Sequence, residues 1–257
     1  MSDWKPELYL KFEKQRTQPS VDLATRIDMP LPQRIIDIGC GPGNSTAVLK
    51  KRWPGAAITG LDSSPAMIAQ ARETDSGISW VCADASGDLS ALGRFDIVFS
   101  NAAIQWMPDH ETLLPNLFSL LKSGGVLAVQ VPNTTSMPIH IALQTLIKTE
   151  KWRAKLGSAS THSTHAVPYY YDILSTLTAD IDLWETHYHH VMESHNALVQ
   201  WYSSTGLRPY LNGLDCETDK TAFLADFEDA LKSAYPAQND GHLLFPFVRI
   251  FFIARKA

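Results

Sequence analysis

The chain has 257 residues, of which 45% are hydrophobic and 19% are charged, a balance that is typical of a globular protein and excludes a disordered one. Lysine and arginine number 22 against 27 acidic residues, and the net charge of -5 disfavours a general surface for nucleic acid or acidic membranes. The first residues are charged rather than apolar, and no run approaches the roughly 18 apolar residues of a membrane span. We therefore expect neither a nucleic-acid partner nor a membrane partner.

The three cysteines, Cys40, Cys82 and Cys216, are odd in number and widely separated. Cys40 and Cys82 lie beside or inside apolar runs, so buried free thiols in a reducing compartment are a better interpretation than a disulfide framework. Together with the charged amino terminus, this pattern predicts a cytoplasmic protein.

The first half of the chain alternates between short β-branched runs and helical segments. The runs predict buried strands at residues 34–38, 57–62, 78–84, 95–101 and 126–131. The segments between them predict helices at residues 45–53, 64–72 and 111–122. Ser64 and Pro65 suit the start of the second helix, and Gly124 with Gly125 suits the end of the third. Strands that alternate with helices predict an α/β fold with a mostly parallel, doubly wound sheet.

The second half loses this rhythm after residue 132. It predicts helices at residues 139–152, 169–177, 195–204 and 219–233, and late strands at residues 181–192 and 247–255. We expect a single domain, residues 1–257, in which residues 33–132 bind a cofactor. The substrate would be covered by residues 1–32, 133–180 and 193–245, because ligands of open α/β sheets bind at the carboxyl ends of the strands.

A glycine-rich loop follows the first predicted strand. Gly39, Gly41 and Gly43 occupy alternate positions, where glycine permits a sharp turn and a close approach of backbone to a ligand. The N–H groups of the helix that begins near Asn44 suit an anionic group. The dinucleotide fingerprint needs a glycine at the sixth position from Gly39, but Asn44 stands there, so the pyrophosphate geometry is not matched. A plain tight turn is the alternative interpretation.

Three acidic residues accompany this loop. Asp37 precedes the first glycine and suits the amino group of a methionine moiety. Asp62 ends the second strand, where two carboxylate oxygens suit the vicinal hydroxyls of an adenosine ribose. Asp84 ends the third strand, where its carboxylate suits the exocyclic N–H of adenine and the N–H of Ala85 suits a ring nitrogen. The alternative is that Asp62 and Asp84 only cap the helices that follow them.

Four successive motifs resemble those of class I S-adenosylmethionine-dependent methyltransferases. They are residues 37–43, 60–68, 84–85 and 95–98. The resemblance covers residues 33–131 and implies a Rossmann-like, seven-stranded sheet whose last strand is antiparallel. It also implies S-adenosylmethionine as cofactor and S-adenosylhomocysteine as product, and it places Ser63 and Asn101 with the other cofactor residues.

A narrower resemblance, to the trans-aconitate 2-methyltransferase family, spans nearly the whole chain. It rests on residues 1–10, 41–46, 104–110, 170–174 and 205–209. It implies transfer of a methyl group to a carboxylate of a small unsaturated tricarboxylic acid, with a monomethyl ester as product. A carboxylate is ionised at neutral pH and a sulfonium is an activated electrophile, so this chemistry needs neither a general base nor a metal. It needs alignment of the reacting atoms, exclusion of water, and donors or cations for the remaining carboxylates.

Candidates for holding such an acid are donors and cations outside the cofactor motifs. Gln105 and Trp106 follow the fourth strand and, with Tyr9, would position the acceptor without acid or base chemistry. The substrate-binding candidates are Arg16, Arg208, Arg249, Tyr170 and Tyr171. A guanidinium is a natural clamp for a carboxylate. The competing interpretations are core packing for Trp106 and the tyrosines, and solvated surface or ion pairing for the arginines.

Other chemistries find less support. His187, His189 and His190 suggest a metal site, but no cysteine or acidic partner with suitable spacing accompanies them, so we expect no metal. No serine lies in a nucleophile-elbow context, which disfavours a hydrolase. Three rival functions stay open: a methyltransferase for another small acid or a nitrogen acceptor, a nicotinamide-dependent oxidoreductase, and a protein that binds the cofactor without turnover.

Overall fold

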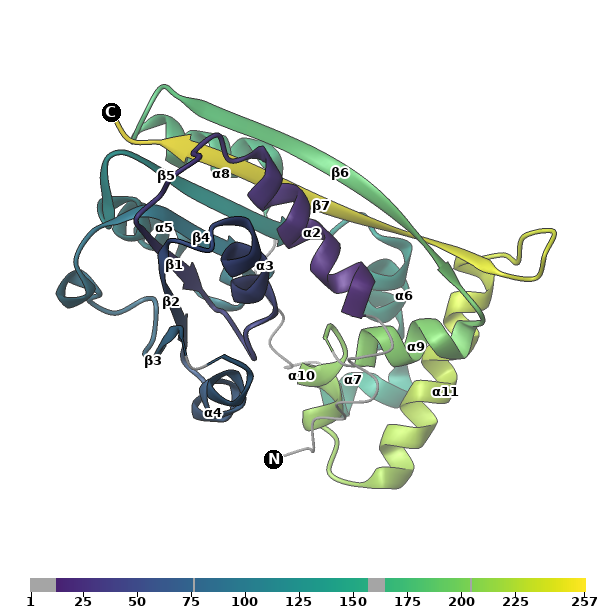
Figure 1. Cartoon of the computed structure of the whole chain (residues 1–257). Coiled ribbons are helices and arrows are strands. Elements are labelled where there is room, and N and C mark those ends of the chain that lie inside the picture. The colour runs from purple at the N-terminus through teal and green to yellow at the C-terminus, as the bar shows by residue number, and fades with distance from the viewer. Residues whose placement is uncertain (1–12, 76, 157–164, 204) are drawn as a thin grey trace. The chain divides into compact units, whose positions relative to one another are not determined.

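The computed structural model describes residues 13–75, 77–156, 165–203 and 205–257 (Figure 1). The chain divides into two compact units. The sheet unit contains Arg16–Pro132, Ser163–Thr186 and Arg249–Ala257, and the helical unit is built mainly from Asn133–His162 and His187–Val248. Each unit has a hydrophobic core of its own.

A seven-stranded sheet has the order β3-β2-β1-β4-β5-β7-β6. The strands are β1 (Arg34–Ile38), β2 (Ala57–Asp62), β3 (Ser79–Cys82), β4 (Phe95–Asn101), β5 (Leu121–Pro132), β6 (Ile181–Met192) and β7 (Leu243–Arg255). Strands β1 to β5 pair in parallel, and β7 pairs with β5 in the antiparallel sense. The predicted doubly wound sheet with an antiparallel last strand is confirmed.

Helices cover both faces of the sheet. The sheet unit contains α2 (Glu13–Arg26), α3 (Asn44–Arg52), α4 (Pro65–Thr74), α5 (His110–Ser119), α8 (Val167–Ser175) and the 3₁₀ turns η1 (Ser90–Leu92) and η2 (Ile104–Trp106). The connections between parallel strands are right-handed crossovers. From β1 to β3 the chain moves along the sheet in one direction, and from β4 to β5 it moves in the other, so α3 and α4 lie on one face of the sheet and α5 lies on the other face. Figure 1 shows α2 and α3 in front of the sheet and α8 behind it.

The core of the sheet unit lies on the face that α5 and α8 cover. Alternate residues of β5 and β7 point to this face and pack against both helices. The packed residues include Leu127, Val129, Ile250 and Phe252 from the strands, and Leu113, Leu117, Tyr170 and Leu174 from the helices. The residues that alternate with these along β5 and β7 point to the opposite face of the sheet, which α2 and α3 cover.

Two of the predicted helices depart from the structure by more than two residues at an end or are divided. The helix expected at 111–122 ends at Ser119, and Gly124 and Gly125 lie inside β5 rather than closing the helix. Strand β5 starts early because the buried Leu121 pairs with Phe95, ahead of a register shift at that strand end. The helix expected at 139–152 is two helices, α6 (Pro138–Leu146) and α7 (Glu150–Leu156).

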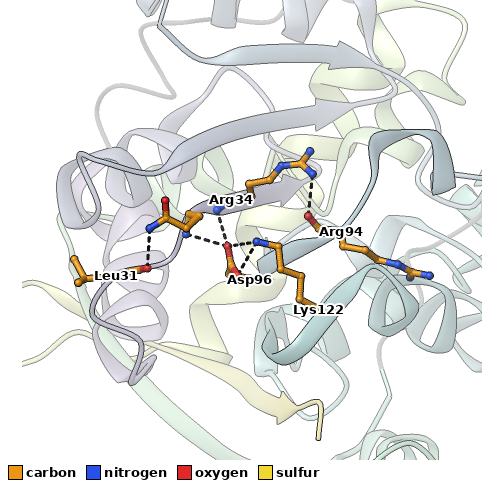
Figure 2. Close-up of polar contacts among 6 residues, drawn as sticks. Leu31, Arg34, Arg94, Asp96 and Lys122 are labelled. Carbon is orange, nitrogen blue, oxygen red and sulfur yellow. Dashed lines mark hydrogen bonds and ion pairs between the residues drawn. The ribbon is translucent and has the colours of Figure 1, made fainter.

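Asp96 ties the amino ends of the parallel strands together (Figure 2). Its Oδ2 accepts hydrogen bonds from the backbone N–H groups of Gln33 at 2.9 Å and Arg34 at 2.7 Å, and Lys122 Nζ lies 2.9 Å from both carboxylate oxygens. Arg34 also donates to the carbonyls of Arg94 and Leu92. This cluster lies at the edge opposite the glycine loop, which indicates a structural role.

The helical unit contains α6, α7, α9 (His195–Ser203), α10 (Arg208–Asn212) and α11 (Glu217–Ala234). Helix α11 packs against α6 and α9. Its buried side chains Phe223, Phe227 and Leu231 form the centre of this core with Trp152 and Trp201. None of the helices in the described ranges is long and apolar enough to cross a membrane.

Candidate cofactor and acceptor site

The glycine loop is bent against neighbouring strand ends. Gly39, Gly41 and Gly43 have φ values of +70°, +54° and +100°, which side chains rarely adopt. The N–H groups of Gly39 and Cys40 both donate to the carbonyl of Leu61 on β2, at 2.7 and 3.0 Å. A Cβ atom on Gly39 would lie 2.2 Å from the Cβ of Ala103, so the segment after β4 leaves room only for glycine there.

Asp62 joins the end of β2 to the glycine loop. Its Oδ2 accepts from the N–H of Gly41 at 2.9 Å, and its Oδ1 accepts from the N–H of Ser64 at 2.8 Å. The hydroxyl of Ser64, as predicted, caps α4 by accepting from the N–H of Met67. Each carboxylate oxygen of Asp62 keeps a lone pair for a further donor. The carboxylate is therefore placed to bind hydroxyl groups beside the loop.

Asp84 follows β3 and is exposed. Its Oδ1 accepts from the N–H and the hydroxyl of Ser86, at 2.9 and 2.6 Å, and these bonds hold the pKa of Asp84 below its ordinary value. The turn that follows contains no helix until η1, so Asp84 does not cap a helix directly. Ser63 is exposed and Ala85 is buried beside these two acids.

Asp37 is fully buried on β1. Its Oδ2 accepts from the hydroxyls of Ser45 and Thr46 on α3, both at 2.7 Å, whereas its Oδ1 has no hydrogen-bond partner in the described ranges. Burial raises the pKa of Asp37 to about 6, against the two hydroxyl bonds, which lower it, and the charge of Asp62 adds to the rise. A cationic group beside Oδ1 would favour the ionised carboxylate.

The segment after β4 is strained and tightly bonded. Ala102 has a φ of +53°, in the left-handed region. The Nε2 of Gln105 donates to the carbonyl of Ala102 at 2.8 Å, which leaves its buried Oε1 without a partner among the described residues. His110 Nε2 donates to the carbonyl of Ile104 at 2.8 Å and so anchors η2 to α5. Trp106 is 49% exposed, which excludes the core-packing interpretation for its ring.

Strand register brings four polar side chains onto the face that α2 and α3 cover. Asn101 on β4 is the register partner of Gln130 on β5. The partner of Gln130 on β7 is Phe251, and Arg249 lies two residues before it. Asp37 on β1 is the register partner of Phe99, which lies two residues before Asn101 on β4. Because register partners and alternate residues share a face, these four residues form one line, here named the polar row.

The polar row contains buried atoms whose hydrogen bonding is incomplete. Asp37 Oδ1, Asn101 Oδ1 and Gln130 Nε2 have no partner among the residues that the structure describes. Arg249, which is 6% exposed, donates from Nη1 to Gln130 Oε1 at 3.3 Å. A buried polar atom without a partner costs roughly 1–3 kcal/mol. Several of them on one face indicate a place where a ligand or water completes the bonding.

The structure separates the predicted substrate residues. Tyr170 is fully buried and packs against Phe252 and His110, so it has the core-packing role that the sequence left open. Tyr171 is 54% exposed on α8. Arg16 is half-buried on α2. Tyr9 lies outside the described residues.

Arg208 belongs to the helical unit and begins α10 rather than lying in a turn. It is exposed, and its guanidinium has no hydrogen bond or ion pair within the ranges that the structure describes. His187 and His189 lie on β6, and His190 packs against Trp201 with ring centroids 5.0 Å apart. In the described part of the chain, no group of three or more His, Cys, Asp or Glu residues is arranged to hold a metal ion.

Sequence reasoning missed Gln130. A single amide in the apolar run of β5 is a weak signal, because its meaning depends on which residues of β4 and β7 lie beside it. The bond to Arg249 joins two strands that are far apart in the sequence. Only the register of the antiparallel last strand could have revealed it.

Comparisons with known proteins show the family of the chain. Residues 35–125, which include the glycine loop and strands β1 to β4 except Arg34, match the family model of a methyltransferase domain. Trans-aconitate 2-methyltransferases of Escherichia coli O157:H7 and Shigella flexneri are each 43% identical over 256 residues, covering 100% of this chain and 99% of theirs.

Solved structures of low sequence identity share the fold. The YcgJ protein of Bacillus subtilis has a TM-score of 0.59 at 14% identity and covers 93% of this chain and 98% of its own. Phosphoethanolamine N-methyltransferase 2 of Haemonchus contortus, solved with S-adenosylhomocysteine, has a TM-score of 0.57 at 17% identity, over 93% of this chain and 53% of its own. With the full-length identity above, these findings show that the chain belongs to the trans-aconitate 2-methyltransferase family of class I S-adenosylmethionine-dependent methyltransferases.

Proposed function

We propose that this chain transfers the methyl group of S-adenosylmethionine to a carboxylate oxygen of trans-aconitate or a closely similar small polycarboxylic acid. The observation that carries the proposal is the 43% identity to trans-aconitate 2-methyltransferases over the whole chain. The buried Arg249 on the polar row supports it, because a guanidinium suits an anionic acceptor. A metal-free, base-free transfer is consistent with a carboxylate, which needs no deprotonation.

The residues around the glycine loop fit S-adenosylmethionine. We assign Asp62 and Ser63 to the ribose, and Asp84 with Ala85 to the adenine. The methionine moiety is assigned to Gly39, Gly41, Gly43, Asn44, Asp37 and Asn101. Two orphaned buried acceptors, Asp37 Oδ1 and Asn101 Oδ1, suit an ammonium group. When bound, the cofactor supplies a sulfonium-activated methyl group.

The acceptor side is assigned to residues that position and neutralise, not to proton-transfer groups. Gln105 and Trp106 follow β4 beside Ala102, and with Tyr9 they would set the direction of attack and exclude water. Arg249, Arg16, Arg208 and the exposed Tyr171 would supply cations and a donor for the carboxylates. Residues 1–32, 133–180 and 193–245 would cover the acceptor. Alignment of this kind can supply effective molarities of roughly 10⁵–10⁸ M.

A panel of acceptors tests the proposal. The chain is incubated with methyl-labelled S-adenosylmethionine and trans-aconitate, cis-aconitate, citrate, a dicarboxylate and a primary amine. We expect transfer to the unsaturated tricarboxylate to have the highest kcat/KM. A preference for the amine would support a nitrogen acceptor instead, and transfer to no compound despite cofactor binding would support a binding protein without turnover.

A cytoplasmic location is part of the same proposal. Cys40, Cys82 and Cys216 are all free. Cys40 is buried as expected, but Cys82 and Cys216 are exposed, so the expectation of a buried thiol is wrong for Cys82. Exposed thiols are typical of a reducing compartment, where small metabolic acids and S-adenosylmethionine are also dissolved.

A further inference from the structure

The polar row changes its hydrogen-bonding character along the sheet. On β1 and β4 the unpartnered atoms are acceptors, the Oδ1 atoms of Asp37 and Asn101, whereas on β5 the unpartnered atom is the donor Nε2 of Gln130. Arg249 on β7 contributes a guanidinium, which can only donate. A ligand group over β1 and β4 must therefore donate or carry positive charge, and a group over β5 and β7 must accept or carry negative charge.

Arg249 fixes the orientation of the Gln130 amide. Arg249 Nη1 lies 3.3 Å from the oxygen Oε1 of Gln130. Since the guanidinium has no acceptor, the amide oxygen must face it, and the Nε2 hydrogens point elsewhere. Gln130 is fully buried, so bulk water does not reach this donor. Its backbone is held between β4 and β7 by pairing on both sides.

The order of the strands indicates which ligand this donor meets. Asp62 ends β2, Asp84 follows β3, and the glycine loop follows β1. Strands β4, β5 and β7 lie on the other side of β1. A cofactor held by the loop and these two acids has its adenosine over β2 and β3 and its methionine end at Asn101 on β4. This leaves β5 and β7, with Gln130 and Arg249, to the acceptor.

We propose that Gln130 is a specificity-determining residue whose Nε2 donates a hydrogen bond to a carboxylate of the acceptor acid, with Arg249 holding the amide in that orientation. The inference rests on the proposed function. It assigns a residue of the substrate site from β5, which none of the sequence motifs contains. It also gives Arg249 a second role, because Arg249 orients the amide of Gln130 in addition to supplying a positive charge.

Gln130→Glu tests the donor directly. The new carboxylate keeps an oxygen for Arg249, but it replaces the free N–H with a charged acceptor that repels the acid. We expect the KM for trans-aconitate to rise about 100-fold or more, with the Kd for S-adenosylhomocysteine changed less than about threefold. Affinity for S-adenosylhomocysteine also shows that the variant is folded.

Gln130→Met gives the same test without a buried charge. It keeps the length of the side chain and removes the donor, and we expect the KM for trans-aconitate to rise about tenfold or more. The preference for the tricarboxylate over a dicarboxylate, as a ratio of kcat/KM values, should fall by a similar factor. If Gln130 had only a structural role, its replacement would lower kcat/KM for the tricarboxylate and for the dicarboxylate by the same factor. Gln33→Met, just before β1 at the edge opposite the glycine loop, is the matched control, and it should leave both the KM for trans-aconitate and this preference unchanged.

The possible results distinguish a failure of the inference about Gln130 from a failure of the proposed function. If the wild-type chain methylates the acid while Gln130→Met retains its KM and its substrate preference, Gln130 has no role in recognition and the inference is wrong. If both variants lose affinity for S-adenosylhomocysteine but not for the acid, the donor meets the carboxylate of the cofactor, and the inference is again wrong. A wild-type chain that neither binds nor methylates any acid contradicts the proposed function itself.

Discussion

At the scale of single residues, Gly39 is the position where a cofactor loop and the segment after β4 are closest. An alanine Cβ there would lie 2.2 Å from the Cβ of Ala103, whereas at Gly41 nothing lies within 4 Å. Both residues have positive φ, so alanine costs about 1–2 kcal/mol of backbone strain at either. We expect Gly39→Ala to weaken binding of S-adenosylhomocysteine at least about tenfold more than Gly41→Ala does. Isothermal titration measures both, and equal losses would show that the contact with Ala103 is unimportant.

Asp62 is the residue that the ribose assignment depends on. Both of its oxygens already accept backbone N–H groups, so Asp62→Asn keeps one acceptor for the loop and removes the charge and the second acceptor. We expect the Kd for S-adenosylhomocysteine to rise about tenfold or more, and a smaller rise for the analogue without the 2′-hydroxyl, which has already lost part of the interaction. The same loss for both ligands would contradict the assignment.

Asp37 makes stability depend on pH in an unusual direction. Its pKa of about 6 in the folded chain lies above the value of about 3.9 for an unfolded aspartate. The folded state therefore binds more protons between these values, and its contribution to stability falls as pH rises from about 4 to 6, by on the order of 3 kcal/mol. Asp37→Asn should remove this fall. Urea unfolding at pH 4.5 and 7 checks it, and an unchanged difference between the two pH values would count against the burial argument.

At the scale of elements, the strands were predictable to the residue where burial and turn signals agree. The bounds of β1, β2, β4 and β6 match the expected ranges. The early start of β5 was not predictable, since Lys122 looks like the last turn of a helix until its partner Asp96 is known. The glycine loop and its acids were evident from local spacing. Gln130 was not, because its role depends on strand register.

The Asp96 cluster is the element-scale feature with the clearest energetic consequence. Burial tends to raise the pKa of Asp96, but Lys122 and the N–H groups of Arg34 and Gln33 outweigh burial and hold the pKa below its ordinary value. A lowered pKa stabilises the fold above about pH 4, and this contribution is lost as pH falls through the folded pKa. We expect Asp96→Asn to cost about 1–3 kcal/mol at pH 7, and less below pH 4.

Urea unfolding at pH 7 and pH 3 measures this difference. Asp229→Asn is the control, because Asp229 forms an ion pair with Lys232 on the surface of α11, and such pairs contribute about 0–1 kcal/mol. Equal effects of the two substitutions on the free energy of unfolding would show that the Asp96 cluster stabilises the fold no more than a surface ion pair does.

At the scale of the whole molecule, each of the two compact units has a hydrophobic core of its own. The sheet unit contains the glycine loop, the acids and the polar row, whereas the helical unit contains Arg208. We propose substrate recognition for both kinds of structure: Gln130 and Arg249 on the sheet, and the covering segments outside residues 33–132. Loops and inserted helices commonly carry such specificity on a rigid sheet.

The most direct test of the account is a single-turnover reaction of the purified chain with methyl-labelled S-adenosylmethionine and trans-aconitate. We expect the label to move to the acid in an amount equal to the enzyme–cofactor complex. Mild base should then release it as methanol, as an ester requires. Label that stays on the cofactor, or that enters a base-stable product, would contradict transfer to a carboxylate oxygen.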